Sequence, residues 1–281
     1  LTDADYNVAV GAYALDADTK GSQNTAIGYG TLSTQNFTTA TDSLNTAVGY
    51  LAGLGVTTGK DNTIVGGLAA DALTEGERNT AIGRSALTLD TLGSRAVAVG
   101  FGSLQTQNFT TATDNYNVGV GFNAGASITT GLQNTILGGL AGDALSDADY
   151  NVAIGTSALG ADTLGSRAVA IGRNALITQN FTTATNNYNV AVGYSAGGAI
   201  TTGTLNTLIG GLAGDALTSG NNNTAVGYLA LSADTLGDRN TAIGNSALAA
   251  QNFTTSTDSY NVGVGFTTGA SITTGIRNTL V

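Results

Sequence analysis

Carboxylates and hydroxyls are the only abundant side chains in this sequence that could take part in catalysis. The 281 residues include 19 Asp and Glu and 9 Lys and Arg, but no His and no Cys. The commonest general base, the thiol nucleophile and the preferred ligands of transition metals are therefore missing. Paired carboxylates can cleave glycosidic bonds, but no acidic cluster stands apart from the repeat that contains it. We expect no catalytic residue and no enzymatic activity.

Three pairs of alternating carboxylates could bind Ca²⁺, which prefers oxygen ligands on turns. The pairs are Asp3 and Asp5, Asp16 and Asp18, and Asp147 and Asp149. They do not recur in every repeat, and the Gly-rich nonapeptide of calcium-binding β-rolls is absent. Solvent-exposed turns are the preferred interpretation. We therefore expect no cofactor and no metal site, with Ca²⁺ as the one alternative.

Four Asn-Phe-Thr tripeptides, which recur at equal intervals along the chain, are the most distinctive local feature. Their first residues are Asn36, Asn108, Asn180 and Asn252. Asn-x-Thr is an acceptor sequence for N-linked glycans, and a surface bulge at this place could instead contact another chain or a receptor. A turn in which Asn and Thr bond their own backbone is the preferred interpretation. Glycosylation and surface contact stay open as alternatives.

These features belong to a repeat, and the repeat decides the fold. The motif Asn-[Thr/Val]-small-[Ile/Val/Leu]-Gly begins at residues 7, 24, 45, 62, 79, 96, 117, 134, 151, 168, 189, 206, 223, 240, 261 and 278. Three short spacings and one long spacing follow one another in a fixed order, which makes a 72-residue superrepeat of four coils. A coil this short, with Gly at its fifth position, cannot hold a helical hairpin.

The motif predicts a short strand that ends in a turn. Residues 117–121, Asn-Val-Gly-Val-Gly, alternate as a β-strand does. A second, weaker extended stretch follows in most coils, for example at residues 199–202. These elements predict an all-β parallel β-solenoid of about fifteen coils of 17 or 21 residues, stacked at about 4.8 Å. We expect residues 1–281 to form one continuous array, a segment of a longer fibre.

Alternation along the strand places the second and fourth motif positions on one face and the third on the other. The fourth position is always aliphatic, which predicts that it forms the core ladder of the solenoid. This ladder contains Val10, Ile27, Val48, Val65, Ile82, Val99, Val120, Ile154, Ile171 and Val192. The first position is Asn except at Ala96 and Ala168, and it predicts a ladder of stacked amides at a corner of the coil.

The third motif position is then expected to face outward. Most coils carry Ala or Gly there, which would let another backbone approach closely. Once per superrepeat the position is aliphatic, as Ile64, Ile136, Leu208 and Leu280. These four residues are predicted contacts with a neighbouring chain. The alternative is a flattened coil with two internal faces.

Motifs such as Asn24-Thr25-Ala26-Ile27-Gly28-Tyr29 and Asn223-Thr224-Ala225-Val226-Gly227-Tyr228 resemble the head repeats of trimeric autotransporter adhesins. They are also similar to the Asn-Thr-Ala-Ile-Gly arrays of phage tail fibres. The resemblance covers essentially the whole chain. It implies a left-handed parallel β-roll, three chains around one axis, and a role in adhesion or reach. Both coil types here are longer than the coils of the adhesin heads, and the 72-residue superrepeat is not part of that pattern.

Charge and composition narrow the functional classes. The net charge is −10 and the basic residues are scattered, whereas a nucleic-acid-binding protein presents a clustered basic face. No apolar run approaches the roughly 20 residues of a membrane span. We expect a non-enzymatic structural protein of an extracellular fibre or filament on a cell or virion surface, self-associating as a homo-oligomer, with a trimer favoured. The alternative is an adhesin or tail-fibre shaft that binds a host receptor or glycan.

Overall fold

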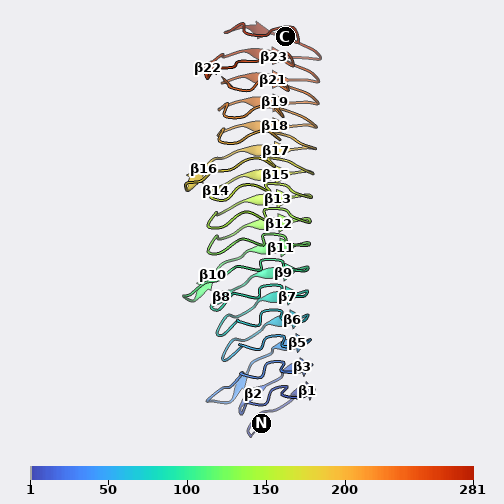
Figure 1. The fold of residues 1–281 in the computed structure, drawn as a ribbon, viewed down its shortest axis with the longest axis vertical. Coiled ribbons are helices and arrows are strands. Elements are labelled where there is room, and N and C mark those ends of the chain that lie inside the picture. The colour runs from blue at the N-terminus through green and yellow to red at the C-terminus, as the bar shows by residue number, and fades with distance from the viewer. Residues whose placement is uncertain (1) are drawn as a thin grey trace. The chain divides into compact units, whose positions relative to one another are not determined.

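The structure, a computed structural model, describes residues 2–281 and is all-β. It is a parallel β-solenoid in which each coil places a short strand beside the strand of the coil before it (Figure 1). The chain divides into two compact units, Leu1–Gly139 and Leu140–Val281. The predicted fold is therefore confirmed, while one continuous array across both units stays a prediction. No helix in the described part of the chain is long and apolar enough to cross a membrane.

The main sheet of the first unit is made of the motif strands in chain order. They are β1 (Val8–Val10), β3 (Thr25–Ile27), β5 (Thr46–Val48), β6 (Thr63–Val65), β7 (Thr80–Ile82), β9 (Val97–Val99), β11 (Val118–Val120) and β12 (Thr135–Leu137). Each residue pairs with the residue at the same motif position in the next coil, as Ala26 does with Ala47. The spacing of the motif along the sequence thus becomes the register of the sheet.

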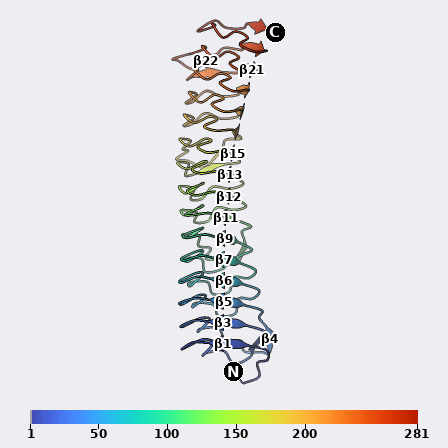
Figure 2. The same ribbon diagram turned by 90° about the vertical axis from the view of Figure 1, so that its right-hand side faces the viewer.

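The second unit repeats this arrangement with its own main sheet. Its strands are β13 (Val152–Ile154), β15 (Val169–Ile171), β17 (Val190–Val192), β18 (Thr207–Ile209), β19 (Thr224–Val226), β21 (Thr241–Ile243), β23 (Val262–Val264) and β24 (Thr279–Leu280). The register again joins equal motif positions, for example Ala191 with Leu208. Figure 2 shows that within each unit the main-sheet strands lie one above the next.

Short two-residue strand pairs occur only where a long coil follows a short coil. They are β2 (Gly21–Ser22) with β4 (Thr41–Asp42), β8 (Gly93–Ser94) with β10 (Thr113–Asp114), β14 (Gly165–Ser166) with β16 (Thr185–Asn186), and β20 (Gly237–Asp238) with β22 (Thr257–Asp258). In Figure 1 the labelled β8, β10, β14, β16 and β22 lie at the left margin, apart from the main-sheet strands. The extra residues of the long coil therefore form a lateral bulge.

The second strand predicted at residues 199–202, and at the equivalent stretch of other coils, is absent from the described residues. Residues 199–202 form turns and bends, although Ala199 and Thr201 still donate backbone bonds to the next coil, at 3.0 and 2.8 Å. Between the motif and this stretch the backbone enters the left-handed region at Gly193, Ser195 and Gly197, with φ of 142°, 50° and 59°. Such a turn reverses the chain without a second strand. The prediction of two strands per coil was therefore wrong for the coils outside the lateral bulges. A second strand of two residues does occur in the coils of β2, β4, β8, β10, β14, β16, β20 and β22.

The fifth motif position needs Gly for two reasons. Gly28 has φ of 137°, a region that other residues rarely adopt. A Cβ on Gly28 would also collide with the backbone carbonyl of Gly49 in the next coil. The invariant Gly of the motif is thus explained by both backbone conformation and close stacking of successive coils.

The predicted inside and outside of the main sheet are reversed in the structure. The third motif position is buried: Ala26, Ala47 and Ala81 have no exposed surface. The fourth position is on the surface, and Val10 and Ile27 are 57% and 39% exposed. The prediction of a core ladder was therefore wrong for all its members, which are exposed or half-buried: Val10, Ile27, Val48, Val65, Ile82, Val99, Val120, Ile154, Ile171 and Val192.

The predicted contacts with a neighbouring chain were wrong for the same reason. Ile64, Ile136 and Leu208 are completely buried inside their own coils. Leu280 pairs with the buried Gly263 at the same inward position and is half-buried. These residues belong to the core and cannot reach another chain.

The size of the buried residue at the third motif position depends on the side chain at the ninth position of the coil. The coil of β7 carries Leu87 at its ninth position, and this buried side chain leaves space only for Ala81 at the third. In the coil of β5 the ninth position is Gly53, and the neighbouring coil supplies Ile64 instead. A Cβ on Gly53 would lie only 3.0 Å from Ile64 Cδ1. Ala and Gly are thus found inside because a narrow coil must keep its packing volume constant.

Candidate functional surfaces

The first motif position forms the predicted ladder of amides, which is structural. In the first unit Asn79 donates its backbone N–H to Asn62 Oδ1 (2.9 Å) and its side-chain amide to the Gly93 carbonyl (2.9 Å). Both Asn side chains are buried. Each amide thus joins its own coil to the next, and the ladder satisfies backbone groups at the corner that would otherwise be buried without partners.

The coils that lack Asn at this position contain a compensating residue that sequence reasoning missed. Ala96 and Ala168 interrupt the ladder, and Asn115 and Asn187 replace the missing amide by accepting the backbone N–H of the next motif Asn, both at 2.9 Å. Where the long coil keeps its motif Asn, Ser43 and Ser259 occupy the compensating position instead. Comparison of the four superrepeats with one another would have revealed this exchange.

A buried Asp-Gln network joins each long coil to the coil before it. Asp90 Oδ1 accepts backbone N–H groups from Gly93 and Phe109, both at 3.1 Å. Asp90 Oδ2 accepts the side-chain amide of Gln107 (2.6 Å). Gln107 Oε1 in turn accepts the amide of Asn117 (2.9 Å). This carboxylate is fully buried, and it has no cation beside it but several neutral donors.

The same network recurs once per superrepeat. Asp18, Asp162 and Asp234 accept the amides of Gln35, Gln179 and Gln251 at 2.6, 2.5 and 2.6 Å. The predicted solvent-exposed turn at Asp16 and Asp18 is correct for Asp16 but wrong for Asp18, which is buried. The signal was the recurrence of Asp-Thr-x-Gly in the coil before each Gln-Asn-Phe.

The long-coil tripeptide has a buried centre and polar ends. Phe37, Phe109, Phe181 and Phe253 are buried. The preceding Asn side chains are exposed at positions 36, 180 and 252 and half-buried at Asn108. Asn36 Oδ1 accepts the hydroxyl of Thr19 (3.1 Å), and its backbone N–H donates to Thr57 (3.0 Å). The Phe therefore anchors the bulge rather than contacting another chain, while the Asn remains accessible.

The outer face of the main sheet carries a row of apolar side chains. We define it as the second and fourth motif positions, which carry Thr or Val and then Val, Ile or Leu in every coil. In the first unit these side chains are half-buried or exposed, with Val8 and Val10 the most exposed. A continuous aliphatic strip of this kind is unusual on a monomeric protein.

Aromatic and Arg side chains border this face. All 10 Tyr residues are exposed, as are Phe101, Phe122 and Phe266. All of them except Tyr13 directly precede the motif Asn or directly follow the motif Gly. Every Arg occupies one of the same two places: Arg78, Arg84, Arg95, Arg167, Arg173, Arg239 and Arg277. The border therefore concentrates the two residue classes that dominate binding energy at protein interfaces.

These side chains stack on one another along each unit. Tyr29 and Tyr50 stack with ring centroids 5.7 Å apart, and Phe101 and Phe122 do so at 5.5 Å. In the second unit the Arg167 guanidinium lies between Tyr150 and Tyr188, at 5.2 and 5.7 Å from the ring centroids. Stacking holds the side chains in defined positions and so reduces the entropy lost when a partner binds.

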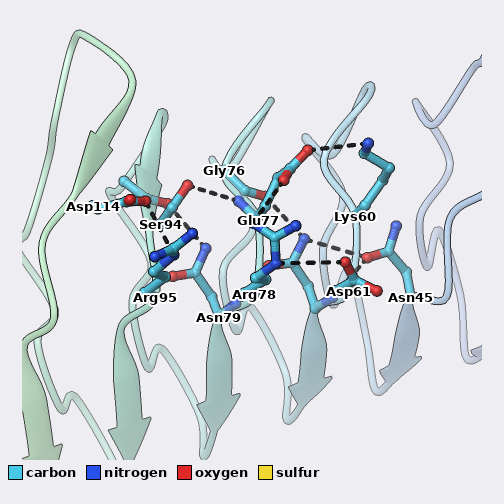
Figure 3. Close-up of polar contacts among 12 residues, drawn as sticks. Asn45, Lys60, Asp61, Gly76, Glu77, Arg78, Asn79, Ser94, Arg95 and Asp114 are labelled. Carbon is cyan, nitrogen blue, oxygen red and sulfur yellow. Dashed lines mark hydrogen bonds and ion pairs between the residues drawn. The ribbon is translucent and has the colours of Figure 1, made fainter.

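Ion pairs on the border are exposed and add little stability. Figure 3 shows Glu77 contacting Lys60 (3.4 Å) and Arg78 (3.3 Å). Arg95 Nε lies 3.3 Å from Asp114 Oδ1 without hydrogen-bond geometry, so this contact is electrostatic. The hydroxyl of Tyr116, bonded to Arg95, and the charge of Asp114 raise the pKa of that guanidinium. Exposed pairs of this kind contribute at most about 1 kcal/mol each.

Asp215 is an unusual acidic residue because its Oδ1 is buried without a hydrogen-bond partner in the described part of the chain. Asp71, at the equivalent place in the first superrepeat, accepts the hydroxyl of Thr88 (2.5 Å). Desolvation raises the pKa of the Asp215 carboxyl, although its own backbone N–H partly opposes this. The folded state therefore keeps the carboxyl proton to a higher pH than the unfolded state does. The free energy of unfolding falls as pH rises above about 3.9, the pKa of Asp in the unfolded chain.

Replacing Asp215 by Asn is consequently expected to stabilise the protein at neutral pH by about 1 kcal/mol. The gain should disappear below about pH 4, where the carboxyl is protonated in both states. Urea unfolding of the variant and the parent protein across this pH range measures the difference. Asp71→Asn is the matched control and should give no gain, because Thr88 already satisfies that carboxylate. Equal gains from both substitutions would contradict the assignment.

Within residues 2–281, no group of three or more Asp or Glu side chains could hold a metal ion. Asp3 contacts Lys20 (4.0 Å), and Asp5 and Asp149 donate backbone N–H groups to Ser22 and Ser166. No model of a known protein family matches this chain, and no curated protein matches its sequence. The function must therefore be argued from the surfaces of the solenoid.

Proposed function

We propose that this chain is a non-enzymatic structural segment of an extracellular fibre or filament on a cell or virion surface. The supporting observation is that nearly every coil is tied to the next by three ladders. These are the main-sheet backbone bonds, the buried motif Asn amides and the hydroxyl column that includes Thr57 and Thr74. Each repeat needs only its neighbours for stability, so such a protein can be lengthened by adding repeats.

Stacked ladders of this kind favour a mechanical role. Backbone bonds and buried amides protect each coil edge from water and from proteases, because cleavage requires local unfolding. The superrepeats also repeat the same motifs and coil types in the same order, so the aliphatic outer face recurs many times. A dedicated recognition site would more often break the repeat symmetry, as catalytic and binding residues do on other scaffolds.

The proposed fibre self-associates through the outer face, and its partner is a second copy of this chain. The face is aliphatic and is bordered by stacked aromatic and Arg side chains. All seven Arg lie on this border, where Asp61 is the one acidic residue that directly precedes or follows a motif, in a chain of net charge −10. The nearby Glu77, Asp114 and Asp258 are paired with border Arg residues, so two such faces can approach each other with less acid–acid repulsion than the rest of the surface would cause. The equal repeat length of identical chains also keeps the contacts in register along each unit.

The mass per unit length of the assembled protein, from scanning transmission electron microscopy, tests this proposal. We expect three chains per coil rise. A value of one chain per coil rise, at concentrations at which the protein forms fibres, would contradict self-association through this face. Two chains would keep the interface and reject the trimer.

Charged substitutions on the outer face are expected to separate the chains. Val99→Asp and Val120→Asp together place two carboxylates on adjacent strands β9 and β11 without disturbing the inward residues Ala98 and Gly119. Burying them in an interface would be strongly unfavourable, so the mass should fall to that of a single chain. Thr58→Asp, on an exposed position away from the main sheet, is the control and should leave the mass unchanged.

The second candidate is an adhesin or tail-fibre shaft that binds a receptor or glycan through the exposed aromatic side chains. Stacked pairs such as Phe101 and Phe122 offer flat apolar surfaces of the kind that sugar rings contact. This function would be supported if Phe101→Ala and Phe122→Ala abolished binding to a glycan array while the mass per unit length stayed the same. Loss of assembly with these variants would instead place the aromatics in the fibre interface.

A further inference from the structure

Many exposed positions differ among the four superrepeats, although some, such as Thr39 and Thr58, are the same in all four. The residue before the motif Asn, for example, is Asp61, Gln133, Leu205 and Arg277 at equivalent places. The long coil is also variable at a half-buried position, which holds Ser33, Gln105, Ile177 and Ala249. Against this background the Asn-Phe-Thr tripeptide is the same in all four superrepeats. Substitutions have accumulated independently in each of the four superrepeats. An exposed residue that is nevertheless the same in all four is therefore under a constraint.

Packing explains only part of that constraint. Phe37 is buried and must remain large and apolar. Asn36 lies in the hydroxyl column, where other coils carry Thr or Ser, such as Thr57, Thr74 and Ser146. Its Oδ1 accepts the Thr19 hydroxyl, as Asn108, Asn180 and Asn252 accept those of Thr91, Thr163 and Thr235. An exposed Thr would be the ordinary residue of this column, so packing alone does not require Asn.

The third residue of the tripeptide has no structural role that would preserve it. Thr38, Thr110, Thr182 and Thr254 are exposed, and within residues 2–281 their hydroxyls make no hydrogen bond to the protein. Thr41, three residues later, differs because its hydroxyl bonds the Thr39 carbonyl and so shapes the turn. The two unexplained polar residues, Asn at the first and Thr at the third place, are those that define an N-glycan acceptor.

We propose that Asn36, Asn108, Asn180 and Asn252 are acceptors for N-linked glycans. The Nδ2 atom makes the new bond to the anomeric carbon of a sugar, and the bond from that carbon to the phosphate of an activated glycosyl donor breaks. The phosphate-bearing group leaves with the electron pair, and Nδ2 loses one proton to the transferase. The Thr19 hydroxyl donates to Oδ1, and within residues 2–281 the Nδ2 of the exposed Asn36 side chain makes no hydrogen bond. Thr38, two residues on, is free to contact the transferase.

The fold sets the spacing of the modified sites. Within each unit the two acceptors are four coils apart in the same column, which corresponds to about 19 Å at the usual spacing of β-strands. Each acceptor lies on the lateral side of the coil, twelve residues beyond the first residue of the motif. Sugars at these places leave the outer face free, so this modification does not depend on the proposed self-association.

Mass spectrometry of the protein isolated from the organism that makes it tests the proposal. Peptides are treated with an amidase that removes N-linked sugars in ¹⁸O water, which marks each formerly modified Asn as ¹⁸O-labelled Asp. We expect the label at all four positions. Asn222-Asn223-Thr224 also fits the acceptor pattern, but Arg78 and Tyr150 replace its Asn in other superrepeats, so it serves as a chance occurrence and should carry less label. Unlabelled Asn at all four sites, or label at Asn222 alone, would overturn the proposal.

Variants separate modification from folding. Thr110→Ala leaves Asn108 and its bond to Thr91 intact, yet it should abolish the sugar at Asn108 only. Thr110→Ser should retain it. Both variants should unfold at the same urea concentration as the parent chain without sugar, because the Thr110 hydroxyl has no role in packing. Sugar on the Thr110→Ala variant would show that the tripeptide is not the recognised feature.

Discussion

Replacing Asp90 by Ala is expected to lower the free energy of unfolding by about 4 kcal/mol. The substitution removes the acceptor of three hydrogen bonds at once, from Gly93, Phe109 and Gln107. All of these donors are buried between two coils and cannot turn to water. Because an unsatisfied buried donor costs about 1–3 kcal/mol, this is the largest effect we expect from a single substitution.

Asp90→Asn should also destabilise the protein, although it preserves shape. The Gln107 amide donates to Asp90, and Gln107 Oε1 accepts from Asn117, so the network has a fixed direction. An Asn at position 90 presents an N–H₂ group to the N–H₂ group of Gln107. Rotating Gln107 would only move the conflict to Asn117. We expect a loss of about 2 kcal/mol.

An exchange variant tests the directionality itself. Asp90→Asn combined with Gln107→Glu lets the new amide donate to the new carboxylate, which still accepts from Asn117. It should recover most of the stability lost in Asp90→Asn alone. Urea unfolding followed by circular dichroism measures all three variants. If Asp90→Asn were as stable as the parent protein, or if the exchange gave no recovery, the buried carboxylate would not be the organising group.

Replacing Ile64 by Ala is expected to cost about 3 kcal/mol, because it opens a cavity beside Gly53 in the core of the coil. Val65→Ala, one residue later, is the matched control. Val65 lies on the outer face, so its loss should cost about 1 kcal/mol or less in the isolated chain. Unfolding by urea at a protein concentration low enough to prevent assembly compares the two.

A complementary substitution tests the volume balance of the core. Ala81→Ile adds three carbon atoms beside the buried Leu87 and should destabilise by about 1–3 kcal/mol through overpacking. Ile64→Ala and Ala81→Ile would both cost little if the sequence-based assignment of the faces were correct, because both residues would then lie on the surface. In that case Ala81→Ile would lie on the surface and cost little, while Val65→Ala would give the large loss.

The sequence by itself determined the architecture and the register. The regular spacing of the motif starts predicted which residues pair, and the structure pairs Ala26 with Ala47 and Ala47 with Ile64 as expected. The role of the motif Asn was also predictable, since a repeated amide at a corner has few other uses. A period is a one-dimensional property, and parallel stacking converts it directly into neighbours in space.

The tertiary structure alone decided which face of each strand is the interior. Alternation separates the third position from the second and fourth but cannot say which set points inward, since a one-residue shift exchanges the faces. The usual assumption that the larger aliphatic residues are buried is wrong for Val65 and right for Ile64. The reason is the narrow interior of so short a coil, where Leu87 already fills the space and only Ala fits beside it. Inside and outside were set by the volume shared between neighbouring coils, and that volume exists only once the chain has been wound into a solenoid.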